Sequence, residues 1–144
     1  MELRNPQEIE ASVEARFRTF LILWAGILAS VGVFIPFAMM VGTQSTPNPT
    51  ISYALLAGGV MMFAVSFLVK QKLTQQAIDK KDIAALQAAH IVTLALCEAA
   101  GLFGLLNYLT TASNLSWFLF AISAIGILLN FPSKDRIRAV LYKQ

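Results

Sequence analysis

A single carboxyl group, that of Glu98, lies where it could bind a proton inside a membrane. The other seven of the 8 Asp and Glu residues lie in polar segments, whereas Glu98 lies ten residues inside an apolar stretch, 88–110. At 1.5 Å per residue, its carboxyl is about 15 Å deep in a hydrocarbon core of about 30 Å. A charged carboxylate there costs at least about 2.5–3.5 kcal/mol, so the group should be protonated, partnered or beside water. Two hypotheses follow: a proton or ion site, and a neutral side chain that hydrogen-bonds another helix and locks the bundle.

His90 is the second residue with candidate chemistry, because it lies eight residues before Glu98 at the start of the same stretch. An unperturbed imidazole has a pKa of about 6.5, so His90 could pass protons through water toward a buried carboxyl. The alternative is an interfacial side chain with one hydrogen bond. The chain has one His and one Cys, Cys97, so we expect neither a metal or haem site nor an internal disulfide.

The sequence lacks the residue patterns typical of enzymes. It has no Gly-rich phosphate loop, HExxH helix, nucleophile elbow or pair of catalytic carboxylates. We therefore expect no catalytic residues, no cofactor and no metal ion, and a protein that is not an enzyme. The basic residues lie beside apolar stretches and are not interleaved with exposed aromatic side chains, which disfavours nucleic-acid binding.

The residues around Glu98 form the segment Leu-Ala-Leu-Cys-Glu-Ala-Ala-Gly-Leu-Phe-Gly-Leu, from Leu94 to Leu105. This segment resembles the carboxylate-bearing helix of ATP-synthase c-subunits, the rotor-ring proteolipids, in which an aromatic-Gly pair also follows the essential Glu. The resemblance implies that Glu98 carries a proton, and that Ala99, in place of a hydroxyl residue, favours H⁺ over Na⁺. It does not extend along the chain, which lacks the Arg-Gln-Pro turn of that family and has two further apolar stretches.

Composition places these residues in a membrane protein. Hydrophobic residues make up 57% of the chain and charged residues 13%, with a mean hydropathy of +0.66, whereas a soluble domain has about 25% charged residues. Four apolar stretches, at about 19–42, 51–69, 88–110 and 115–132, are each close to the length that crosses a bilayer as a helix. We therefore predict an all-α integral membrane four-helix bundle of two hairpins, as a single membrane domain over residues 1–144.

All basic residues lie on one predicted side of the membrane. They occur in the N-terminal segment, in the central segment 70–87, into which the flanking helices are expected to continue, and at the C-terminus. By the positive-inside rule, both termini and the central segment are cytoplasmic, in a multi-pass protein of a bacterial-type inner (plasma) membrane. These residues are Arg4, Arg16, Arg18, Lys70, Lys72, Lys80, Lys81, Lys134, Arg136, Arg138 and Lys143.

The two ends of the chain are expected to form short amphipathic cytoplasmic segments. In residues 1–18, Asn5 is a predicted N-cap, and apolar residues recur every four positions from Ile9 to Phe17. Residues 133–144 form a basic tail with an apolar stripe. This tail either lies on an anionic leaflet or is solvated and only fixes the topology.

Small residues four positions apart give three of the predicted helices faces suited to close contact in lipid. Pro36 removes a backbone donor within the first stretch, which predicts a kink. Spacing does not decide whether these contacts lie within one chain or between chains. The expected partners are therefore the lipid bilayer and either a second copy of the chain or other subunits of a membrane complex. The small residues pair as Gly26 with Ser30, Ala54 with Gly58, Cys97 with Gly101, and Ala100 with Gly104.

The last apolar stretch ends in Pro-Ser-Lys-Asp-Arg, from Pro132 to Arg136. The chain resembles uncharacterised small four-span bacterial membrane proteins that end in a Pro-Ser/Thr-Lys-Asp/Glu-Arg/Lys segment, a likeness that carries no known activity. The first hypothesis for function is a structural or accessory component of a membrane assembly that self-associates. The alternative is a proton- or ion-translocating subunit in which Glu98 is the cycling carboxyl and protons come in at His90.

Overall fold

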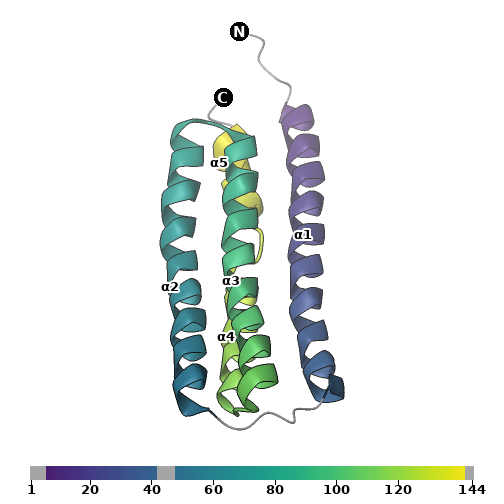
Figure 1. Cartoon of the computed structure of the whole chain (residues 1–144). Helices are drawn as coiled ribbons and strands as arrows, with labels where there is room; N and C mark the ends of the chain where they lie inside the picture. The colour runs from purple at the N-terminus through teal and green to yellow at the C-terminus, as the bar shows by residue number, and fades with distance from the viewer. Residues whose placement is uncertain (1–5, 42–47, 142–144) are drawn as a thin grey trace.

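Five helices make up the described part of the chain (Figure 1). The structure is a computed structural model that describes residues 6–41 and 48–141, and these ranges contain no strand. The predicted all-α class is confirmed. The helices are α1 (Pro6–Val41), α2 (Pro49–Asp79), α3 (Ile83–Thr111), α4 (Leu115–Leu129) and α5 (Lys134–Leu141).

Three of the helices, α1, α2 and α3, are each long and apolar enough to cross a membrane. α4 and α5 are separated by a bend of 46°, and the two together form a fourth candidate span if they are taken as one bent helix. Alone, the 15 residues of α4 reach only about 22 Å at 1.5 Å per residue, less than a hydrocarbon core of about 30 Å. The helices are therefore consistent with a multi-pass membrane protein of three or four spans.

Local sequence sets the turn between α2 and α3. α2 ends at Asp79, and Lys81 in the turn adopts a left-handed backbone conformation with φ 53°. The carboxylate of Asp82 then accepts hydrogen bonds from the N–H groups of Ala84, at 2.8 Å, and Ala85, at 3.2 Å, as Asp does at a helix N-terminus. Both helices continue past their apolar stretches, as predicted, and a short turn joins them as an antiparallel hairpin.

The expected N-terminal segment is not separate from the first apolar stretch. α1 is one helix from Pro6 to Val41, with no break where the apolar stretch begins. The helix also continues through Pro36, so the predicted kink does not end it. The predicted N-cap, Asn5, lies outside the described residues.

The apolar stripe of the first turns of α1 packs inside the protein, not on a membrane surface. Its residues join a cluster with α5, which folds back against α1 because its own apolar stripe completes the cluster. The apolar stripe of α5 is therefore buried against α1, an arrangement that the sequence analysis did not consider. The buried members of the cluster are Val13, Phe20, Ala77, Leu86, Ile137 and Val140.

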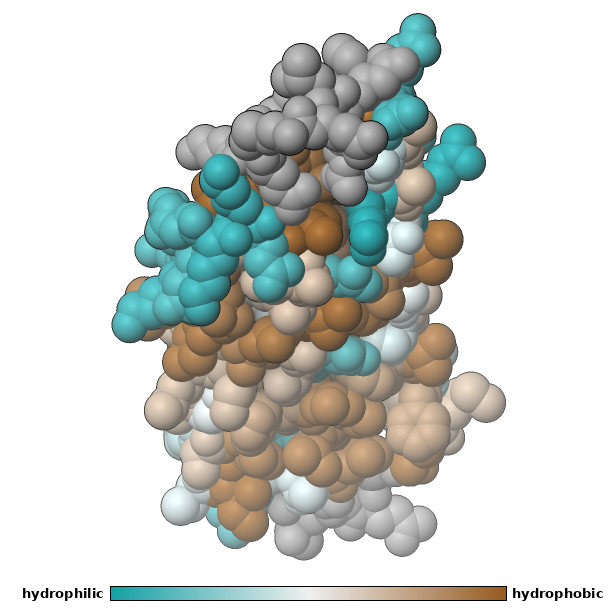
Figure 2. Space-filling view, turned by 90° about the horizontal axis from the view of Figure 1, so that it is seen from above, coloured by the Kyte–Doolittle hydropathy of each residue, from teal (hydrophilic) through white to brown (hydrophobic). Residues whose placement is uncertain are grey.

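α3 is the central helix and contacts each of the other four. α1 and α2 lie on opposite sides of α3 in Figure 1, and within the described ranges no Cα atom of one lies within 8 Å of a Cα atom of the other. The start of α1, the α2–α3 turn and α5 share one end of the molecule, called the charged end below. Figure 2 views the molecule from this end and shows hydrophilic side chains gathered beside a mainly hydrophobic surface.

Candidate functional site

Glu98 lies on α3 and faces α1, where its carboxyl oxygen contacts the hydroxyl of Ser30. The same hydroxyl oxygen lies 2.7 Å from the backbone carbonyl oxygen of Ile27, in the preceding turn of α1. A hydroxyl has one hydrogen, so Ser30 donates either to the carbonyl or to the carboxylate. A protonated Glu98 donates to Ser30 while Ser30 donates to Ile27, whereas an ionised Glu98 accepts from Ser30. Hydrogen bonding between α3 and α1 is therefore compatible with both protonation states of Glu98.

A second hydrogen bond attaches α1 within two turns of Ser30. The indole N–H of Trp24 donates to the backbone carbonyl oxygen of Ile127 in α4, at 2.7 Å. Val31, which is buried on α1, belongs to an apolar cluster with Leu94 of α3 and Ile127. α1 is thus bonded to both α3 and α4 in its apolar part.

Cys97, next to Glu98 in the chain, belongs to a buried polar network that joins α2, α3 and α4. Its thiol sulfur lies 3.4 Å from the Ser66 hydroxyl oxygen and 3.6 Å from the Asn130 amide nitrogen. The Ser123 hydroxyl donates to the Cys97 backbone carbonyl at 2.7 Å. Each of these four residues is at most 2% exposed. The network links three helices through side chains that are almost fully buried.

The sequence analysis did not single out Ser66, Ser123 or Asn130. One signal could have found two of them: Ser116, Ser123 and Asn130 are spaced by seven residues. That spacing places them on one face of a helix, and all three are buried. The period marks the face of α4 that packs on its neighbours.

Glycines on α3 allow a close approach between α3 and α4. A Cβ placed on Gly104 would lie 3.0 Å from the Cβ of Leu119 and 3.1 Å from the backbone oxygen of Ser116. A Cβ placed on Gly101 would lie 2.9 Å from the Ser123 hydroxyl oxygen. The contact at Gly101 is shorter than real Cβ atoms show, and those at Gly104 are tighter than most, so a side chain at either position would require its neighbours to shift.

Of the remaining residues predicted to pack between helices, some contact a neighbouring helix and others are exposed. A Cβ placed on Gly58 of α2 would lie 2.9 Å from the ring of Phe103, and Ala100 is fully buried. In contrast, Ala54 is exposed, and Gly26 is exposed with no atom within 4 Å of an added Cβ. The close contacts therefore lie among α2, α3 and α4, and not along α1.

His90 lies toward the charged end, apart from Glu98. Its ring packs edge-on against Phe20 of α1, with ring centroids 5.2 Å apart. Its Nε2 atom is buried and has no hydrogen-bond partner among the described residues. His90 lines a cavity of about 30 Å³ together with Asn130, and Glu98 is not part of that lining. The structure therefore does not bring the two candidate proton-handling residues into one cavity.

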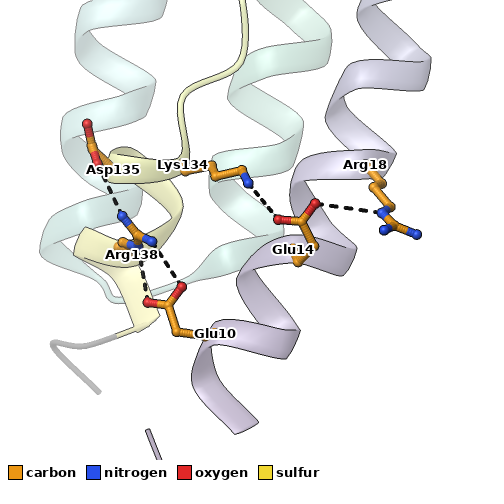
Figure 3. Close-up of polar contacts among 6 residues, drawn as sticks. All are labelled: Glu10, Glu14, Arg18, Lys134, Asp135 and Arg138. Carbon is orange, nitrogen blue, oxygen red and sulfur yellow. Dashed lines mark hydrogen bonds and ion pairs between the residues drawn. The ribbon is translucent and has the colours of Figure 1, made fainter. Parts of the chain in front are cut away.

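Ion pairs join α1 and α5 at the charged end (Figure 3). The Lys134 ammonium lies 2.6 Å from a Glu14 carboxylate oxygen, and the Arg138 guanidinium donates to both carboxylate oxygens of Glu10, at 3.1 and 2.9 Å. Glu14 lies in the charged turns of α1 that precede its apolar stretch. The hydrogen bond and the positive charge of Lys134 lower the pKa of this carboxyl below its ordinary value.

Residues 6–41 and 48–141 contain no group of three or more His, Cys, Asp or Glu side chains placed to hold a metal ion. No protein-family model matches the chain, and neither a curated protein nor a solved structure matches it. The two resemblances drawn from the sequence stay predictions, and the function is argued from the geometry.

Proposed function

We propose that this chain is a small integral membrane protein that serves as a structural or accessory component of a membrane assembly, and that it is not an enzyme. The contact between Glu98 and Ser30 carries the proposal. Glu98 is the one carboxyl in the apolar part of the chain, and it is bonded to a neighbouring helix. Polar side chains that bond across helices stabilise bundles in lipid, where apolar surfaces provide no drive for association.

The other polar groups in the apolar region support the same role. Ser123 bonds the backbone of α3, Trp24 bonds the backbone of α4, and Cys97 contacts Ser66 of α2. Each of these contacts joins two helices. An interior in which polar atoms hold helices together suits a scaffold better than a conduction path, which needs polar atoms that face water.

We further propose four spans with both termini in the cytoplasm, in a bacterial-type inner membrane. The basic residues of the three polar segments support this orientation, because cytoplasmic segments carry the excess of Lys and Arg. The fourth span would cover residues 115–132, that is, α4 and the three residues that follow it, because α4 alone is too short for a bilayer of ordinary thickness. No nucleic-acid partner is proposed.

The proposed partners are the bilayer and a second copy of the chain or other membrane subunits. Large apolar side chains are exposed on the outer faces of α1 and α2, and water would not solvate them well. Lipid covers such faces in a membrane protein, and neighbouring subunits cover part of them in an assembly. These side chains include Ile22, Val33, Phe37 and Met40 on α1, and Tyr53, Met61 and Leu68 on α2.

The alternative function is a proton- or ion-translocating subunit. One observation favours it: Ser30 has a hydrogen-bonding arrangement for both protonated and ionised Glu98. A cycling carboxyl also needs access to water, and the cavity lined by His90 is not lined by Glu98. The alternative therefore ranks second.

Purified protein in liposomes separates the two functions. The structural proposal predicts that wild type and Glu98→Gln leave proton permeability at the level of protein-free vesicles. It also predicts that Glu98→Gln keeps its melting temperature, because an amide still bonds to Ser30, while Glu98→Leu melts lower. Leu102→Ala, on the exposed face of α3, is the control and should change neither the proton permeability nor the melting temperature.

A proton flux in wild type that Glu98→Gln abolishes would replace the structural proposal by the alternative. No flux together with an unchanged melting temperature for Glu98→Leu would contradict both proposals, because the carboxyl would then serve neither conduction nor packing.

A further inference from the structure

The two faces of α5 carry basic side chains in different surroundings. Lys134 and Arg138 face α1, where the carboxylates of Glu14 and Glu10 neutralise them (Figure 3). Arg136 lies two residues after Lys134, which places it about 200° around the helix, and it lines the cavities beside α2 together with Lys70. The chain neutralises one basic face of α5 with its own carboxylates and not the other.

Lys70 and Arg136 share a groove at the charged end. The groove has a volume of about 420 Å³ and is also lined by Thr74, by two glutamines and by Phe67. The smaller cavity of about 30 Å³ adjoins it, since Lys70, Thr74 and Arg136 line both. The groove thus offers two cations, a hydroxyl and amides on one side and an aromatic ring at its edge.

Neither cation has an ion pair among the residues that the structure describes. Lys70 donates one long hydrogen bond, 3.4 Å, to the backbone oxygen of Leu129. Asp135, next to Arg136 in the chain, contacts Arg138 at 3.7 Å, and Asp79 accepts a hydrogen bond from the groove residue Gln75 at 3.0 Å. Two like charges that face one groove repel each other, and a bound anion would offset that repulsion.

The small cavity adds a buried polar wall with open hydrogen-bonding capacity. His90 and Asn130 line it, and their Nε2 and Oδ1 atoms are buried with no hydrogen-bond partner among the described residues. A cavity of about 30 Å³ has room for a water, which needs about 10–15 Å³ by this measure. A water there would lie beside Lys70 and Arg136, which line both the cavity and the groove.

We infer that the groove between α2 and α5 binds a phosphate group, carried by the headgroup of an anionic phospholipid. Arginine matches the geometry of a phosphate with paired N–H groups, and lysine adds a point charge. Lys70 is the first charge after the apolar stretch 51–69, the depth at which a leaflet presents its headgroups. Phe67 in the lining provides apolar surface for an acyl chain.

Native mass spectrometry of the full chain in a nonionic detergent tests this site. Phosphatidylglycerol, phosphatidylcholine and inorganic phosphate are added separately, and bound adducts are quantified. Wild type should retain phosphatidylglycerol in preference to phosphatidylcholine. The double variant Lys70→Gln, Arg136→Gln should bind phosphatidylglycerol about twenty-five-fold more weakly, which corresponds to about fivefold for each cation removed near an anionic headgroup.

The charge-matched control is Lys72→Gln, Lys80→Gln, which removes two exposed lysines from the same end of α2 without touching the groove. This control should keep the preference for phosphatidylglycerol. An equal loss of phosphatidylglycerol binding in both double variants would overturn the site, because it would indicate a general effect of positive charge. Unchanged binding in the Lys70 and Arg136 variant would also overturn it.

Two further outcomes keep the test decisive. If inorganic phosphate binds as well as phosphatidylglycerol and displaces it, the lipid as the source of the phosphate is overturned. If the double variant does not fold, Arg136→Gln alone replaces it, because this exposed side chain lies outside the apolar cluster of α5. The single variant should bind phosphatidylglycerol about fivefold more weakly than wild type. Unchanged binding would overturn the site.

Discussion

α1 and the group formed by α2, α3 and α4 are held in one molecule by different kinds of contact. Within the group, a Cβ added at Gly59, Gly104 or Gly126 would lie 3.0 Å or less from a neighbouring side chain. On α1, neither Gly26 nor Gly32 has an atom within 4 Å of an added Cβ. Both α1 glycines are exposed, so the close approaches that depend on glycine lie among α2, α3 and α4.

Directional bonds attach α1 in addition to its buried apolar side chains. Ser30 contacts Glu98, Trp24 bonds the backbone of α4, and Glu10 and Glu14 pair with α5. In lipid, a helix is held by tight packing or by polar contacts, since apolar surface alone does not favour protein over lipid. Polar contacts occur in both parts of this small protein, whereas close approaches at glycine occur only among α2, α3 and α4 within the described residues.

The largest expected effect is a loss of close packing inside the group. Gly104→Val should lower the free energy of unfolding by about 2–3 kcal/mol, because the added carbon meets the Cβ of Leu119 and the backbone of Ser116, which cannot move aside freely. Unfolding titrated with SDS and followed by circular dichroism measures this change. Gly32→Val on α1 is the matched control and should change the value by less than about 0.5 kcal/mol. Equal losses at both glycines would remove the distinction between the two parts.

A middle-sized effect is expected from the bond between α1 and α4. Trp24→Phe removes the indole N–H that donates to Ile127 and should cost about 1 kcal/mol in the same titration. The control is Trp117→Phe on α4, an exposed indole, with a smaller expected loss. A Trp24 variant as stable as wild type would mean that apolar contacts alone position α1.

The smallest effect concerns the charged end. The pKa of Glu14 is lowered in the folded protein from its ordinary value of 4.5. The ion pair with Lys134 therefore adds stability above pH 4.5, and this contribution is lost as the pH falls through the lower folded pKa. Wild type should melt slightly higher than Glu14→Gln at pH 7 and equally at about pH 3. Glu8→Gln, an exposed carboxyl with no ion pair among the described residues, should show no such pH-dependent difference. If wild type still melts higher than Glu14→Gln at about pH 3, the ion pair between Glu14 and Lys134 is not the source of the difference in melting temperature.

The sequence predicted the helical class and the apolar helices because the length of an apolar run is itself the physical requirement for crossing a bilayer. The sequence did not predict which surface the apolar stripe at the start of α1 packs against. The residues from Ile9 to Phe17 form the same periodic pattern whether they face a leaflet or α5, and the structure places them against α5.

The site was predictable in part, for a similar reason. Glu98 stood out because a carboxyl in an apolar run is costly. Ser30 was predicted only as a packing residue, because the spacing pattern counts serine as a small residue and takes no account of its hydroxyl. Its bond to Glu98 depends on the rotation of α1 about its axis, which the sequence does not specify. Ser66 carries no periodic signal of its own, and only the fold brings it to Cys97.

A double-mutant cycle between Ser30 and Glu98 tests most directly whether the intramembrane carboxyl serves to hold α1. Ser30→Ala, Glu98→Leu and the double variant are unfolded with SDS, and Ser12→Ala, which removes a hydroxyl bonded within α1, replaces Ser30→Ala in the control cycle. We predict a coupling of about 0.6–1.7 kcal/mol between Ser30 and Glu98, the range of interhelical hydrogen bonds in bilayers, and none in the control cycle. Losses at Ser30 and Glu98 that add to within about 0.3 kcal/mol would contradict the account.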